Sequence, residues 1–114
     1  MTFDEYQVKA ESTNLTPAEA PELLSISFMD KLLGLVGESG ELADKIKKIL
    51  RDKQGQWTEE DRQELIKELG DVLWYIAALA PLLGVSMEEV ARRNLEKLAG
   101  RKQRNELSGK GDNR

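Results

Sequence analysis

The sequence contains no cysteine and no histidine. Without cysteine, the chain can form no disulfide, no thiolate nucleophile and no zinc–thiolate site. Without histidine, it lacks the commonest general base and the Glu-x-x-His pairs of di-iron helical bundles. Any metal held by side chains must therefore be bound through oxygen, which favours magnesium, with manganese as a substitute.

Long apolar runs are also missing. No run reaches the ~18 residues of a membrane span, and no charged-then-apolar leader opens the chain. We therefore expect a cytoplasmic protein with no membrane partner. The net charge of −4 argues against a nucleic-acid partner, although residues 92–104 carry a local excess of five positive charges. A solvated helix face is the default interpretation of such a run.

The 114 residues suit one domain, and 39% hydrophobic with 33% charged residues is typical of a helix-rich protein. Apolar residues recur at helical spacing, and Ser or Thr followed by an acid three residues later predicts helix starts. The expected helices run to about Glu11 from a cap at Thr2, from about Leu24 to Arg51, from Thr58 to about Leu82, and from Ser86 to about Lys102. Residues 12–20 are expected to connect the first two. We predict a single all-α domain over residues 1–104 and a disordered tail over 105–114.

The stretch Val72–Ala80 is apolar on nearly every side of its helix. Such a helix is buried all round. One chain of this length does not easily cover it, so we expect a subunit interface made by helices, with a homodimer or homotetramer as the assembly.

Two acidic pairs dominate the polar residues of the central helices. Glu38 and Glu41 form one pair, and Glu68 and Asp71 form the other, each at i, i+3 and therefore on one side of its helix. The short loop between the helices predicts an antiparallel hairpin in which the pairs face each other. Four converging carboxylates repel each other unless cations lie between them, and magnesium suits such a site.

The acids also have a simpler interpretation. Acidic i, i+3 pairs are common on exposed helix faces, and Glu41 could pair with Lys45 at i, i+4. Asp71 is harder to explain this way, because it opens the apolar stretch. Gly40 and Gly70 lie inside the acidic motifs, although each glycine costs about 1 kcal/mol relative to alanine in a helix. Close approach of a ligand would explain them, whereas tight helix packing explains Gly34 and Gly37 equally well.

Glu-x-x-Glu, residues 42–67 as spacer, and Glu-x-x-Asp together resemble the signature of the MazG-like all-α nucleoside triphosphate pyrophosphohydrolases. The resemblance extends to "GLVGESGELADKIKK", "ELIKELGDVLWYIAALAPLLGVSMEEV" and "RRNLEKLAGRKQRN", and covers about residues 30–105. Many members have a second Glu beside the first, where this chain has Ser39. The resemblance implies a four-helix bundle-like domain that assembles through its helices.

The resemblance further implies magnesium-dependent hydrolysis of a (deoxy)nucleoside triphosphate to the monophosphate and pyrophosphate, in nucleotide-pool house-cleaning. Glu38, Glu41, Glu68 and Asp71 would be the metal ligands and catalytic residues, one glutamate also orienting the water. Asn94 and Lys97 match the family's Asn-x-x-Lys on the last helix, which helps hold the nucleotide. From helical spacing alone, Asn94 lies on the apolar stripe of that helix and is expected to face inward.

Other assignments remain open. Arg101, one turn beyond Lys97, suits phosphate binding, yet both also fit a solvated basic face. Trp74 and Tyr75 could stack on a base or belong to the core. Among functions, a phosphoribosyl-ATP pyrophosphohydrolase of histidine synthesis and a non-catalytic helical interaction module that kept the fold are the alternatives.

Overall fold

The computed structural model describes residues 1–17 and 25–113, which form helices without any strand. The expected all-α fold class is confirmed. The predicted helix start near Leu24 and part of the predicted connection over residues 12–20 lie outside the described residues. The four helices are α1 (Phe3–Glu11), α2 (Ile26–Lys53), α3 (Glu59–Leu82) and α4 (Met87–Gln103).

Each helix begins at a hydroxyl side chain. The hydroxyl oxygens of Thr2, Ser25, Thr58 and Ser86 each accept a hydrogen bond from the backbone N–H three residues later. At Thr2 and Thr58 the acid three residues on also accepts from the cap's own N–H, which completes the capping boxes. These contacts satisfy backbone donors that have no partner inside the helix, so local sequence fixes where the helices start.

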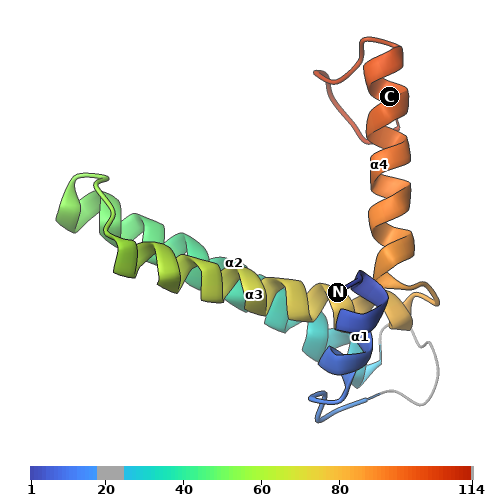
Figure 1. Ribbon diagram of the computed structural model, residues 1–114, viewed down its shortest axis with the longest axis horizontal. Coiled ribbons are helices and arrows are strands. Elements are labelled where there is room, and N and C mark those ends of the chain that lie inside the picture. Colours follow the sequence, from blue (N-terminus) through green and yellow to red (C-terminus); the bar gives the residue numbers. More distant parts are fainter. Residues whose placement is uncertain (18–24, 114) are drawn as a thin grey trace.

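The helices form two arms (Figure 1). Helices α2 and α3 lie side by side as a hairpin, and α4 leaves the end of α3 at an angle of 97°. Helix α1 packs in the corner against α3 and α4. Within the described residues α4 makes no contact with α2, so one end of α4 is anchored and the rest projects away.

Gln7 of α1 holds the corner together. Pro81 has no N–H and cannot donate to the carbonyl of Ala77 four residues earlier. The Gln7 side chain donates to this carbonyl at 2.9 Å, and its amide oxygen accepts from the backbone N–H of Met87, the first residue of α4, at 3.3 Å. One amide therefore satisfies two backbone groups that the bend leaves open.

The buried core lies in the same corner. Ala10, Ala77 and Met87 are buried together, with partly buried apolar side chains around them. No residue of Val72–Ala80 is exposed in the single chain. Only the alanines at positions 77, 78 and 80 are buried, and the other six residues are partly exposed, so the subunit interface expected at this stretch stays a prediction.

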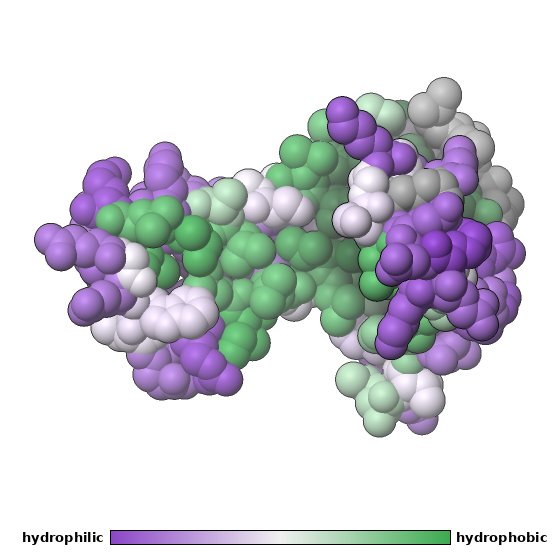
Figure 2. All heavy atoms as spheres, turned by 90° about the horizontal axis from the view of Figure 1, so that it is seen from above, coloured by the Kyte–Doolittle hydropathy of each residue, from purple (hydrophilic) through white to green (hydrophobic). Residues whose placement is uncertain are grey.

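Large apolar side chains are exposed elsewhere. Leu33 and Val36 of α2 are 64% and 62% exposed, and Leu69 of α3 is 54% exposed. Leu95 of α4 is 68% exposed. Figure 2 shows hydrophobic residues as a continuous band along the hairpin toward the second arm. No single helix in the described part of the chain is long and apolar enough to cross a membrane.

Candidate functional site

Three carboxylates meet between the helices of the hairpin. Glu38 of α2 and Glu68 and Asp71 of α3 each offer one oxygen, and the three oxygens lie within 4.8 Å of one another. Glu41 is exposed and is not part of this group. The structure therefore gathers three of the four acids singled out in the sequence, and their role as metal ligands remains a prediction.

The group carries net negative charge. Burial raises the pKa of Glu38 above its usual value, and the charges of Asp71, Glu68 and Glu41 and a hydrogen bond with Glu68 raise it further. Burial and the charge of Asp71 also raise the pKa of Tyr6. Because an added proton relieves this repulsion, an added divalent cation would relieve it too. The oxygen-only donor set fits magnesium or manganese.

Lys45 is the nearest cation to the three acids. Its ammonium lies 3.2 Å from Glu68 and 3.4 Å from Glu64, both on α3. Hydrogen bonding to Glu68 is the main reason that the pKa of Lys45 is raised. The sequence suggested a pair with Glu41 on the same helix, and that suggestion is wrong. Lys45 reaches across the hairpin because the more buried Glu68 is a better-shielded partner.

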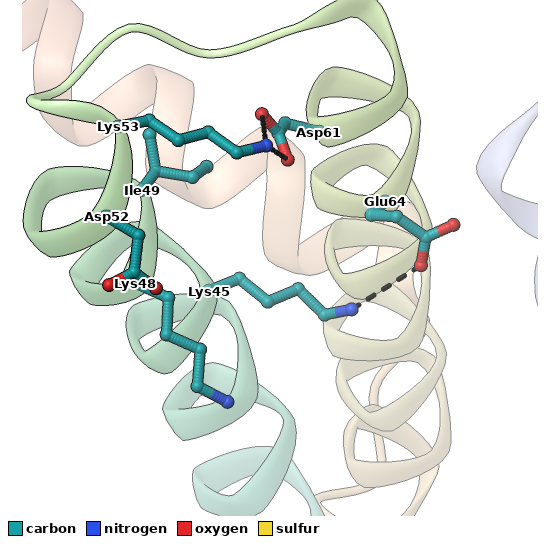
Figure 3. A pocket seen from close by; sticks show the side chains of 7 residues that line it. All are labelled: Lys45, Lys48, Ile49, Asp52, Lys53, Asp61 and Glu64. Carbon is teal, nitrogen blue, oxygen red and sulfur yellow. Dashed lines mark hydrogen bonds and ion pairs between the residues drawn. The ribbon is translucent and has the colours of Figure 1, made fainter.

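A pocket of ≈ 260 Å³ opens beyond Lys45, toward the loop of the hairpin (Figure 3). Lys53 crosses it to bind Asp61 at 2.6 Å, and Lys45 crosses it to Glu64. Lys48 pairs with Asp44 at 2.7 Å. The three lysines that line this pocket are thus paired with carboxylates, so the pocket offers a substrate phosphate no unpaired ammonium.

A second pocket, of ≈ 280 Å³, adjoins the acids and is lined by Thr13, Glu38, Asp71, Trp74 and Tyr75. The Trp74 and Tyr75 rings meet edge to face, with centroids 4.9 Å apart. The Trp74 indole N–H donates to the Thr13 hydroxyl at 2.8 Å. The pocket therefore combines two carboxylates with an aromatic wall, a combination that suits a charged ligand carrying a flat ring.

Lys31 also contacts this wall. It is 2% exposed, and its ammonium donates to Thr16 at 2.6 Å and to Asp30 at 2.8 Å. The same ammonium lies 5.7 Å from the Trp74 ring centre, within range of a cation–π interaction. The role of Lys31 could not be predicted from the sequence, because no local spacing links it to residues 16 or 74.

The three α4 residues singled out in the sequence lie away from the acids, since α4 projects from the corner. Asn94 is exposed, so the expectation that it faces inward is wrong for the single chain. Met87, at the start of the stripe on which Asn94 lies, is buried in the corner, but Val90, Leu95 and Leu98 further along are exposed. Lys97 is half-buried, and Arg101 is only 4% exposed. Both contact Asp112, at 3.0 Å each.

Comparison with known proteins adds to this geometry. The family model described as "MazG nucleotide pyrophosphohydrolase domain" matches residues 27–105. The chain is 47% identical over 116 residues to the Gene 37 protein of Mycobacterium phage L5, with all of both chains covered. It is 43% identical over 72 residues to the uncharacterized protein YvdC of Bacillus subtilis, covering 59% of this chain and 68% of that protein. No solved structure gives a significant match. The matched span holds the three acids, the aromatic wall and all of α4, and this chain is a member of the MazG nucleotide pyrophosphohydrolase family.

Proposed function

We propose that the chain hydrolyses a (deoxy)nucleoside triphosphate to the monophosphate and pyrophosphate, with magnesium, as a cytoplasmic house-cleaning activity on nucleotide pools. The family supports a pyrophosphohydrolase of nucleotides. The observation that carries the proposal is the convergence of Glu38, Glu68 and Asp71 beside a pocket with an aromatic wall.

Glu38, Glu68 and Asp71 would hold the cation. When bound, magnesium would neutralise phosphate charge and make the phosphorus more open to attack. Manganese could replace it, because both ions take oxygen ligands in similar sites. The three acids would thereby position the triphosphate across the hairpin, and Trp74 and Tyr75 would face the base.

Glu41 would orient the attacking water. It lies one turn from Glu38 on α2, outside the group of three carboxylates but close enough for its charge to raise the pKa of Glu38. A carboxylate in this position can accept a proton from water as the water attacks phosphorus. Glu41 would thus serve as the general base in a chain that has no histidine.

A second copy of the chain would complete the site. Helix α4 carries an exposed apolar stripe with Val90, Leu95 and Leu98, and the hairpin carries the exposed apolar band described above. Pairing these surfaces in a homodimer would bring α4 of one copy, with Asn94, Lys97 and Arg101, toward the acids of the other. We expect the assembly to bury more than about 1,200 Å² in total. Light scattering that finds only monomer at micromolar concentration would contradict it.

The test of the activity is a panel of common NTPs and dNTPs plus phosphoribosyl-ATP, each with magnesium and scored for pyrophosphate release. We expect turnover of at least one nucleoside triphosphate by the wild type and none by Asp71→Asn, which keeps the side-chain shape but loses the charge. Turnover of phosphoribosyl-ATP alone would instead assign the chain to histidine synthesis. No release from any substrate would favour the non-catalytic interaction module.

A further inference from the structure

The chain turns back on itself at the end of α4. Asn105 has a positive φ of 60°. Its N–H donates to the carbonyl of Lys102 at 3.2 Å, and the N–H of Glu106 donates to the carbonyl of Arg101 at 2.7 Å. This pair of bonds is a Schellman motif, which ends a helix and reverses the backbone. The tail consequently runs back beside α4 (Figure 1).

The returning tail delivers one carboxylate to two cations. Gly109 and Gly111 have φ values of +142° and +85°, which residues with a Cβ rarely adopt. Beyond them, one Asp112 oxygen lies 3.0 Å from the Lys97 ammonium and 3.0 Å from the Arg101 guanidinium. Arg101 also donates to the Asp112 backbone carbonyl. Lys97 and Arg101 lie one turn apart on α4, so they form a ready pair for one anion.

Asp112 fills this position incompletely. Arg101 is 4% exposed, yet its Nε has no hydrogen-bond partner among the described residues. A buried donor without a partner is costly. A guanidinium binds best when two parallel N–H groups meet two oxygens of one anion, as a phosphate allows. Asp112 contacts both cations through one carboxylate oxygen and leaves Nε of Arg101 without a partner, whereas a phosphate could meet Lys97 and the guanidinium with separate oxygens.

We propose that Lys97 and Arg101 form a phosphate-binding site that the chain's own tail closes with Asp112, so that a phosphate ligand must displace the tail. That the phosphate belongs to a nucleotide rests on the proposed function; the site and its closure do not. The tail then acts as an internal competitor. It lowers the apparent affinity for phosphate by the fraction of time for which it covers the site.

The first test measures binding of inorganic pyrophosphate by calorimetry, in EDTA and at low salt, with the full chain. We expect Asp112→Asn to bind about tenfold more tightly than the wild type, the factor for a tail closed nine-tenths of the time. Asp52→Asn is the matched control, because it removes the same charge from another exposed acid, one paired with Arg51 at 2.7 Å. It should bind like the wild type. Lys97→Met should weaken binding in either background.

The second test follows the tail itself, through tryptic cleavage after Lys110 in the wild type. Pyrophosphate should speed this cleavage, because the ligand frees the tail. The proposal would be overturned if wild type and Asp112→Asn bound pyrophosphate equally, or if Asp52→Asn gained as much affinity as Asp112→Asn. It would also be overturned if no variant bound pyrophosphate, or if pyrophosphate slowed the cleavage. Tighter binding by Asp112→Asn without nucleotide hydrolysis would leave the tail closure standing and remove the proposed function. If the chain hydrolyses a nucleotide but wild type and Asp112→Asn do not differ in pyrophosphate binding or KM, the proposed function would stand and the tail closure would fail.

Discussion

Replacing Gly34 by alanine should push on the Tyr75 ring. A Cβ built on Gly34 would lie 2.1 Å from Cε1 and 2.3 Å from Cζ of that ring. Carbon atoms in contact normally lie about 3.5–4 Å apart. The Tyr75 ring would therefore have to move by about 1.5 Å. This ring lines the pocket beside the three acids, so Gly34 controls a wall of the candidate site.

Two opposed energies decide the outcome. Overpacking of this kind costs about 1–3 kcal/mol, including loss of the edge-to-face contact between Tyr75 and Trp74. Alanine in place of glycine gains about 1 kcal/mol in a helix interior. We expect a net loss of about 1 kcal/mol, which for a chain of this size lowers Tm by about 3–6 °C. Gly37→Ala is the matched control: its Cβ meets no described atom within 4 Å, so it should keep only the gain.

Urea unfolding at fixed protein concentration in metal-free buffer measures both effects. In a Tyr75→Ala background the clash disappears, so Gly34→Ala should become as favourable as Gly37→Ala. The resulting coupling between positions 34 and 75 should be about 1–3 kcal/mol. If Gly34→Ala stabilises the wild type as much as Gly37→Ala does, and shows no coupling to Tyr75, the reasoning fails.

Three further predictions concern the acids. Asp71→Asn should keep or raise the metal-free Tm and lose most of the stabilisation by magnesium; a metal-independent drop in Tm would instead indicate a structural role. Lys45→Met removes the cation that competes with a metal ion for Glu68. Calorimetry should therefore show tighter manganese binding, and melting curves should show a lower metal-free Tm, with Lys48→Met as the control. Unchanged manganese binding would refute the competition. Because the pKa of Glu38 is raised from 4.5 in the folded chain, its contribution to metal-free stability is full below pH 4.5 and is lost as pH rises through the folded pKa. The stability difference between wild type and Glu38→Gln should fall over that range, and a flat difference would contradict it.

The helices could be predicted because their signals are local. Thr2, Thr58 and Ser86 each precede an acid by three residues, and each begins a helix as expected. The i, i+3 spacing of Glu68 and Asp71 likewise fixes their common face once the helix exists. These inferences need only the geometry of one helix, which is why they agree with the structure.

The remainder depends on contacts between distant segments. Asn94 lies on an apolar stripe, but whether that stripe faces inward depends on where α4 goes after the bend. Lys31 is buried because Thr16 and Trp74 meet it in space. Lys45 could form an ion pair with Glu41 on its own helix or with Glu68 across the hairpin. Which pair forms depends on the packing of α2 on α3. Spacing in the sequence carries no information on any of these choices.

The contacts of the Gln7 amide should form late in folding. Its two partners lie 70 and 80 residues further along the chain, whereas α2 and α3 are joined by a short loop and can pair as soon as both exist. Contacts between distant segments form late because closing a long loop costs entropy. We therefore expect α1 to dock after the hairpin has formed, although α1 is synthesised first. A substitution of Gln7 that removes the amide should speed unfolding and leave the early formation of the hairpin unchanged.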